Sequence, residues 1–233
     1  MKMTPIEAAA GDAILVGDPR RAFNLAQELT TQPRMTHQAR GLWGYSGTTL
    51  DGREITVQST GSGGPSAVPV IGDLAEQGVG RMIRLGTCLA LDPALAVGTV
   101  LLVDRVVVAD GAGRSLSGSD FLRPDQALFD AFEGLGRPAT VSSHDLVARY
   151  EPDGGGSAHP GPAIARDLQT AATLAMCRRL DLPAAALLIV AEDTEGHRLG
   201  EADLWDRFRS AGKAVLARLD RLDPDEPNPR VEG

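Results

Sequence analysis

Two short segments of the chain carry residue types that bind anions. The first is Arg84-Leu85-Gly86-Thr87, which follows a hydrophobic run and places a guanidinium and a hydroxyl at the expected end of a strand. The second is Gly17-Asp18-Pro19-Arg20-Arg21, which lies between an apolar run and a helical pattern that starts at once. A strand, a tight turn and a helix N-terminus present free backbone N–H groups and the positive end of the helix dipole to an anion. Two such segments predict that an oxyanion, most simply phosphate, is a substrate.

The composition limits the classes of partner. The chain has 233 residues, of which 42% are hydrophobic, enough for a substantial core. Its formal net charge of −8 argues against a nucleic-acid surface, because binding the phosphate backbone needs a basic face. Cys88 and Cys177 lie in apolar stretches and predict buried thiols. No signal peptide is apparent in residues 1–11 and no apolar run approaches the ~20 residues of a membrane span, so a soluble cytoplasmic protein is expected.

Hydrophobic runs alternate with helical patterns along the chain, and this alternation predicts an α/β fold with helices on both faces of a sheet. Runs rich in Val, Ile and Leu predict strands at 13–17, 42–50, 54–59, 82–86, 99–109, 139–142 and 185–191. Patterns with a period of three to four residues predict helices near 20–30, 66–78, 124–134, 167–181 and 201–222. Because Pro69 is unfavourable inside its helix, that helix is expected to begin late or to bend.

The domain organisation is expected to be simple. No polar linker interrupts the hydrophobic pattern, so residues 1–222 are expected to form one domain. Residues 151–162, rich in Gly and Pro, predict a flexible surface loop. Residues 223–233 contain three prolines and predict a disordered tail.

The sequence gives little support for a dinucleotide-binding loop, a catalytic triad or a metal site. Gly61-Ser62-Gly63 begins a dinucleotide-binding pattern, but the third glycine would have to stand where Ser66 does. Ser143-His144-Asp145 resembles a catalytic triad in composition only, because neighbours in an extended segment point to opposite faces. No metal-ligand spacing is present, so no metal is expected.

A collinear set of segments covers nearly the whole chain: Gly17 to Arg21, residues 40–48, 59–66, 83–88 and 97–100, Ser142 to Asp145, Asp167 to Ala171, and residues 191–193. The set resembles the hexameric purine nucleoside and uridine phosphorylases. The resemblance implies a single-domain three-layer α/β/α sandwich with a central mixed, partly barrel-like sheet. It implies a pentosyltransferase that uses inorganic phosphate as co-substrate, without a cofactor, to cleave the N-glycosidic bond of a purine-leaning or modified nucleoside into free base and (deoxy)ribose 1-phosphate. It also implies a homo-oligomer, a hexamer built as a trimer of dimers.

The resemblance assigns the phosphate site residue by residue. Gly17 would offer its backbone N–H, Arg21 and Arg84 would clamp the oxygens, Thr87 would donate its hydroxyl, and Arg40 would reach in from a neighbouring subunit. Planar guanidiniums bind phosphate oxygens in a bidentate way and position the dianion as a nucleophile, so the assignment is chemically sound. The alternative is that each arginine is an ordinary surface charge.

The resemblance also assigns the leaving-base end. Attack at the anomeric carbon passes through an oxocarbenium-like state, and the departing base needs a proton or a hydrogen bond. Asp193 resembles the acid of the purine side, and with Arg84 it is the predicted catalytic pair. A turn or cap aspartate before Thr194-Glu195-Gly196 is the alternative.

The nucleoside end departs from the pattern of the family. The predicted nucleoside contacts are Leu168, Gln169, Thr170, Leu89 and Val147. Gln169 stands in place of a glutamate that would hold the ribose diol, and an amide forms weaker hydrogen bonds than a carboxylate. Weak activity on ribonucleosides is therefore expected, with Gln169→Glu raising it, unless Gln169 lies on the outer face of its helix.

Three functions are compatible with these residues. The first is a nucleoside phosphorylase. The second is a hydrolytic relative that uses water, which the arginine clamp argues against. The third is a catalytically weak protein that binds nucleoside or phosphate, because fold-level similarity alone does not establish activity.

Overall fold

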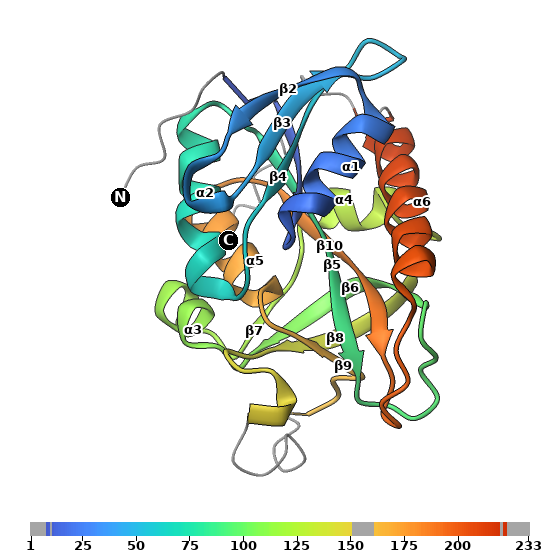
Figure 1. Ribbon diagram of the computed structural model, residues 1–233. Helices are drawn as coiled ribbons and strands as arrows, with labels where there is room; N and C mark the ends of the chain where they lie inside the picture. The colour runs from blue at the N-terminus through green and yellow to red at the C-terminus, as the bar shows by residue number, and fades with distance from the viewer. Residues whose placement is uncertain (1–7, 10, 151–160, 220, 223–233) are drawn as a thin grey trace.

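The computed structural model describes residues 8–9, 11–150, 161–219 and 221–222 (Figure 1). Its helices are α1 (Pro19–Leu29), α2 (Gly64–Glu76), α3 (Gly111–Ser117), α4 (Gln126–Ala131), α5 (Thr170–Arg179) and α6 (Glu201–Leu219), with 3-10 turns at Ala39–Gly41 and Ala148–Tyr150. Its strands are β1 (Asp12–Val16), β2 (Thr31–His37), β3 (Gly44–Thr48), β4 (Glu54–Ser59), β5 (Arg81–Ala90), β6 (Val100–Val108), β7 (Phe121–Leu122), β8 (Arg137–Ser143), β9 (Ala165–Asp167) and β10 (Ala184–Glu192).

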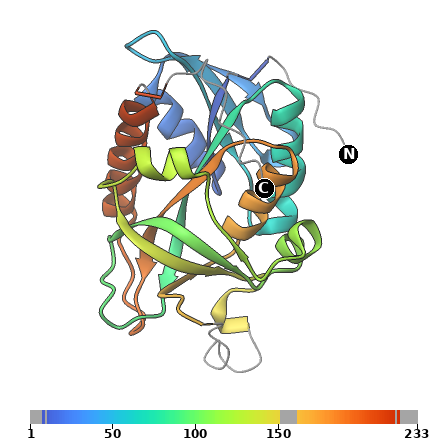
Figure 2. The same cartoon turned by 180° about the vertical axis from the view of Figure 1, so that it is seen from behind.

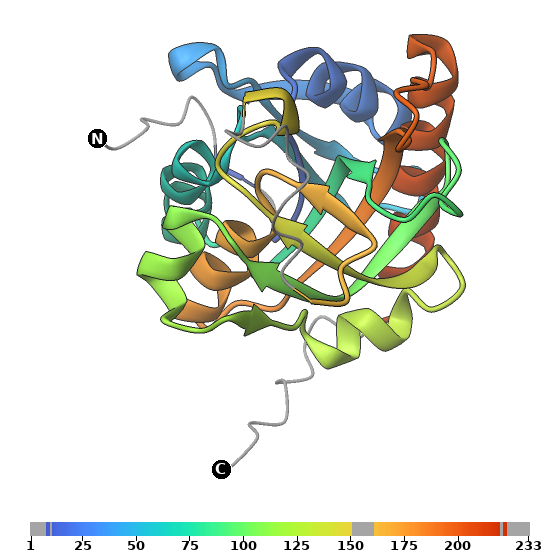
Figure 3. The ribbon, with the colours of Figure 1, turned by 90° about the horizontal axis from the view of Figure 1, so that it is seen from below.

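The strands form one mixed sheet, part of which closes into a ring. The order is β10-β6-β8-β9-β5-β1-β4-β3-β2, and β10 also pairs with β5. Strands β5, β10, β6, β8 and β9 therefore close on themselves, as seen from below in Figure 3, while β1, β4, β3 and β2 extend from β5 as an open sheet. The expected partly barrel-like sheet is confirmed.

Helices cover the sheet from two sides, each over its own hydrophobic cluster. Helices α2 and α5 pack on one side, where Val70, Ile71 and Leu174 are buried. Helices α1, α4 and α6 pack on the other, where Leu25, Phe132 and Phe208 are buried (Figure 2). Burial of these apolar faces confirms the three-layer α/β/α arrangement. No helix of the described residues is long and apolar enough to cross a membrane.

Three details of the expected elements are wrong. Helix α2 begins at Gly64 and runs through Pro69, because its apolar face is fully buried on the sheet and outweighs one missing helical hydrogen bond. Strand β5 runs to Ala90, so Arg84-Leu85-Gly86-Thr87 lies inside a strand rather than at its end. Helix α5 begins at Thr170, because Ala165–Asp167 pairs with β5 and β8 as a strand.

The sequence patterns also left some elements unidentified. Strand β2, helix α3 and the short strands β7 and β9 were not expected. Most of the loop at 151–162 and the whole tail at 223–233 lie outside the described residues.

Candidate active site

A pocket of about 650 Å³ opens where two strands of the sheet separate. Strand β1 pairs with β5 only as far as Leu15 opposite Arg84, and β9 joins β5 only at Leu89. Between these points one edge of β5 has no neighbouring strand in the described sheet, and Arg84 and the residues from Gly86 to Leu89 border the pocket. The gap is therefore a consequence of the sheet topology, and the strand edge supplies side chains to it.

The N-terminus of α1 forms one end of the pocket. Gly17, Asp18 and Pro19 line it, and the Asp18 carboxylate accepts a 2.9 Å hydrogen bond from the Arg21 backbone N–H as the cap of the helix. The Arg21 guanidinium also lines the pocket and lies over the Phe208 ring of α6, 4.8 Å from its centroid. Burial lowers the pKa of Arg21, but an arginine remains charged at neutral pH. This end therefore combines a helix N-terminus with a held cation.

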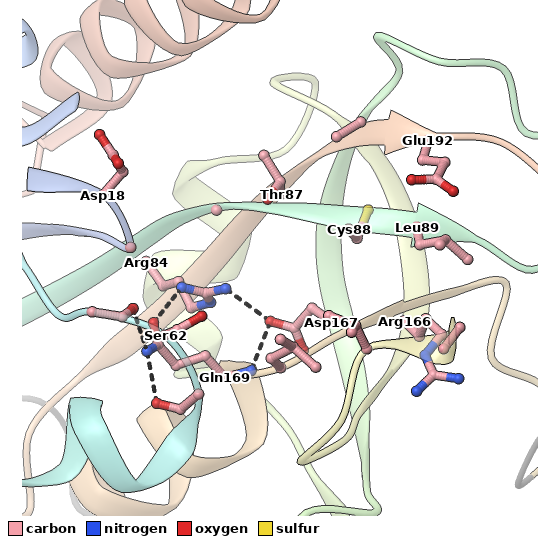
Figure 4. Close-up of a pocket in the computed structure, with 18 of the residues that line it drawn as sticks. Asp18, Ser62, Arg84, Thr87, Cys88, Leu89, Arg166, Asp167, Gln169 and Glu192 are labelled. Atoms are coloured by element: carbon pink, nitrogen blue, oxygen red, sulfur yellow. Dashed lines mark hydrogen bonds and ion pairs between the residues drawn. The ribbon is translucent and has the colours of Figure 1, made fainter. Parts of the chain in front are cut away.

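Arg84 lies deeper, and three described side chains hold its guanidinium, of which Figure 4 shows Asp167 and Gln169. Its Nη2 pairs with Asp167 at 2.9 Å, its Nη1 donates to Gln169 Oε1 at 2.7 Å, and its Nε donates to Thr170 Oγ1 at 3.1 Å. The guanidinium folds back over Gly86, where an added Cβ would stand 2.6 Å from Nη2. Glycine at position 86 is thus required by the path of the arginine two residues earlier on the same face of the strand.

Asp167 holds this cluster together; it lies in one of the segments that resemble the family, but no role was predicted for it. Its carboxylate accepts hydrogen bonds from the Thr170 backbone N–H at 2.9 Å and the Thr170 hydroxyl at 2.6 Å, and from the hydroxyl of Ser143. It therefore satisfies the first turn of α5 while pairing with Arg84. An aspartate at the expected start of a helix was the available signal.

The predicted nucleoside contacts divide into two groups. Leu89, Val147, Leu168 and Gln169 line the pocket together with the predicted phosphate residues Gly17, Arg21, Arg84 and Thr87. Thr170 does not line it, because its side chain is fully buried and its hydroxyl is bonded to Asp167 and Arg84. Gln169 is 2% exposed and precedes α5, so the alternative that places it on the outer face of the helix is wrong.

Glu192, rather than Asp193, enters the pocket at the opposite end (Figure 4). Its carboxylate pairs with Arg198 Nε at 2.8 Å, and both residues line the pocket. The Asp193 carboxylate accepts bonds of 2.9 Å from the backbone N–H groups of Glu195 and His197, as in a turn, and contacts the His197 ring. Desolvation acts to raise the pKa of Asp193, but the hydrogen bonds that its carboxylate accepts from His197 and Glu195 outweigh this effect and lower it.

Arg40 and Cys88 differ in their relation to the pocket. Arg40 is exposed on the turn Ala39–Gly41 and does not line the pocket of its own chain. Cys88 does line the pocket, but burial raises the pKa of its thiol, so it is a protonated wall residue rather than a nucleophile. Among the described residues, no group of three or more His, Cys, Asp or Glu side chains could hold a metal ion.

Comparison with known proteins identifies the family. Residues 12–155 match the family model described as the phosphorylase superfamily. A DeoD-type purine nucleoside phosphorylase of Oceanobacillus iheyensis is 36% identical over 94 residues, which are 40% of each chain. A uridine phosphorylase of Haemophilus influenzae is 38% identical over 100 residues, 43% of this chain and 39% of the relative. The matches thus span less than half the length of these relatives. Since the family model covers more than half of the chain, the protein belongs to the phosphorylase superfamily.

Proposed function

We propose that this protein is a nucleoside phosphorylase that cleaves the N-glycosidic bond of a purine-leaning or modified nucleoside with inorganic phosphate. The observation that carries the proposal is the convergence of Gly17, Arg21, Arg84 and Thr87 on one end of a single pocket. The names of the relatives, purine nucleoside phosphorylase and uridine phosphorylase, support the same reaction class and leave the base open.

In the proposed reaction the pocket holds phosphate at the end formed by α1 and β5. The N–H groups at the start of α1 and the guanidiniums of Arg21 and Arg84 bind the phosphate oxygens, and Thr87 donates its hydroxyl. A phosphate oxygen then attacks the anomeric carbon, the C–N bond breaks, and its electron pair stays on the base nitrogen. Charge-assisted contacts to the dianion fix its orientation, which is the main contribution of these residues to the rate.

At the base end we assign the proton donor to Glu192 instead of Asp193. Glu192 ends β10, lines the pocket and pairs with Arg198, whereas the carboxylate of Asp193 is held in a turn outside the pocket. To neutralise the departing base, Glu192 must give a proton to a purine ring nitrogen, and this requires that the bound nucleoside separate the carboxyl group from Arg198. Leu89, Val147 and Leu168 supply the apolar walls between the two polar ends.

We further propose that the protein works as a homo-oligomer, a hexamer built as a trimer of dimers. Arg40 matches the phosphate residues of the family but is exposed and outside the pocket of its own chain. A neighbouring copy that brings Arg40 to this pocket would add a third guanidinium to the phosphate end. Activity would then depend on assembly.

A nucleoside panel tests the reaction. Ribo- and deoxyribonucleosides of each common base are incubated with and without phosphate, and base release is followed by chromatography. We expect base release that depends on phosphate, together with a pentose 1-phosphate product. Equal release without phosphate would establish a hydrolase. Binding of nucleoside without any release would establish a binding protein.

A further inference from the structure

The carboxamide of Gln169 is fully used inside the protein. Its Oε1 accepts hydrogen bonds from Arg84 Nη1 at 2.7 Å and from the Thr60 hydroxyl at 2.8 Å, which shares its one proton with the Val16 carbonyl oxygen at 3.0 Å. Its Nε2 donates to the carbonyl oxygens of Gly63 at 2.9 Å and Gly61 at 3.2 Å. A side-chain amide has two acceptor positions and two N–H donors, so these four contacts account for all of them.

The four contacts join two walls of the pocket. The glycine-rich loop at residues 60–63 contributes Gly61, Ser62 and Gly63 to the lining, and Arg84 contributes the buried guanidinium. Gln169 is bonded to both and is 2% exposed (Figure 4). On the other side of the guanidinium Asp167 holds Nη2. The orientation of Arg84 is therefore set jointly by the Asp167 carboxylate, the Gln169 amide and the Thr170 hydroxyl.

We propose that Gln169 is a positioning residue of the phosphate end, which fixes Arg84 relative to the loop at 60–63, and that it is not a ligand of the sugar. The inference rests on the proposed phosphorylase function. It also defines the substrate class: because the amide has no group left to offer a ribose diol, ribo- and 2′-deoxyribonucleosides are handled alike at this residue.

An amide, and not a carboxylate, suits these surroundings. In Gln169→Glu one carboxylate oxygen would keep the bonds from Thr60 and Arg84. The other would face the carbonyl oxygens of Gly61 and Gly63, which now accept bonds of 3.2 and 2.9 Å from N–H groups. Three acceptor oxygens without a donor between them repel, and the loop is expected to move away from Arg84.

The test compares Gln169→Glu and Gln169→Met with Gln58→Glu as a matched control. Gln58 is also a buried amide, 1% exposed, whose Nε2 donates to the carbonyl oxygens of Leu42 and Ser59, and neither of these hydrogen bonds involves Arg84. Isothermal titration with inorganic phosphate measures affinity directly. Both Gln169 variants should weaken phosphate binding about tenfold or more, while Gln58→Glu should keep wild-type affinity even if it is less stable.

Kinetics separate positioning from sugar binding. The Gln169 variants should raise the KM for phosphate and change kcat/KM for ribo- and 2′-deoxyribonucleosides by the same factor. A rise of kcat/KM in Gln169→Glu that is confined to ribonucleosides would overturn the proposal and make residue 169 a sugar ligand. Wild-type phosphate affinity in both Gln169 variants would overturn it as well.

Hydrogen–deuterium exchange keeps the inference testable if the proposed reaction itself fails. In a protein that releases no base or binds no phosphate, faster exchange over residues 61–66 in both Gln169 variants, but not in Gln58→Glu, would still support the positioning role. Unchanged exchange in the Gln169 variants would refute it, whatever the outcome of the nucleoside panel.

Discussion

The buried pair of Arg84 and Asp167 allows stability and activity to be separated. The Arg84 and Asp167 side chains are 6% and 0% exposed, and Nη2 lies 2.9 Å from Oδ2. Replacing Arg84 with Met leaves a buried carboxylate without its cation, a change that destabilises proteins by about 3–5 kcal/mol. Asp167 keeps its hydrogen bonds from Ser143 and Thr170, so we expect the free energy of unfolding to fall by about 3 kcal/mol, the lower end of this range.

A second substitution should restore the stability but not the reaction. In Arg84→Met with Asp167→Asn the uncompensated charge is gone, and the asparagine oxygen can still accept from the Thr170 backbone N–H. Urea unfolding at pH 7 should show that most of the lost free energy of unfolding returns. Phosphate-dependent base release should stay about 30- to 900-fold below wild type, which corresponds to about 2–4 kcal/mol of transition-state stabilisation.

Arg81→Met is the matched control. Arg81 also pairs with a carboxylate, Asp12, at 2.6 Å, but it lies outside the pocket, and Asp12 keeps a second partner in Arg53 at 2.8 Å. This variant should lose about 1 kcal/mol of stability and keep wild-type turnover. A double variant as unstable as Arg84→Met would refute the charge argument. A double variant with restored phosphate-dependent turnover would remove Arg84 from the reaction.

Three further predictions concern other parts of the molecule. Glu192→Gln should slow base release about 100-fold while Asp193→Asn leaves it nearly unchanged, as measured by chromatography; the reverse order would return the role of proton donor to Asp193. Arg40→Ala and Arg84→Met should each be nearly inactive, but hybrid oligomers of the two should regain activity because some pockets then receive both arginines, and hybrids without activity would exclude a shared site. Burial raises the pKa of Asp110, so stability is lost as the pH rises from the usual aspartate pKa to the folded pKa and stays low above it. Urea unfolding should accordingly find Asp110→Asn more stable than wild type at pH 8, with the difference vanishing below the usual aspartate pKa, and a difference that does not depend on pH would contradict this.

The sequence was sufficient to predict the strands that are buried on both faces. The strands at 100–108 and 184–192 are long and mainly apolar, and the strand at 54–59 shows Ile55 and Val57 in alternation with polar residues, so all three are easy to identify. Strand β2 was not identified, because Thr31–His37 is largely polar and exposed and is held mainly by its pairing with β3. Strand β9 has only three residues, and its pairing partners β5 and β8 are distant in the sequence. Local patterns carry no information about such pairings.

At the site, the residues placed by local geometry were predictable and those placed by register were not. Gly17 and Arg21 follow from a strand, a turn and a helix start that lie within ten residues of one another. Glu192 and Asp193 are adjacent acids at a strand end. Because successive side chains of a strand point to opposite faces, the alternation should show which of the two faces the pocket. The pairing of β10 with β5 shifts between Val190 and Glu192, so the alternation is broken where it matters. Both Ala191 and Glu192 then line the pocket.

Gln169 shows why the type of a buried polar residue is set by the atoms around it. Read from the sequence, an amide in place of a carboxylate signals a weakened grip on the sugar, and restoring the carboxylate should raise turnover on ribonucleosides. In the structure the same position meets two donors and two backbone carbonyl oxygens. Only a group that both accepts and donates satisfies that set, and a carboxylate cannot donate. The geometry therefore predicts that Gln169→Glu disturbs the phosphate end before it can serve the sugar, the opposite of the expectation from residue chemistry alone.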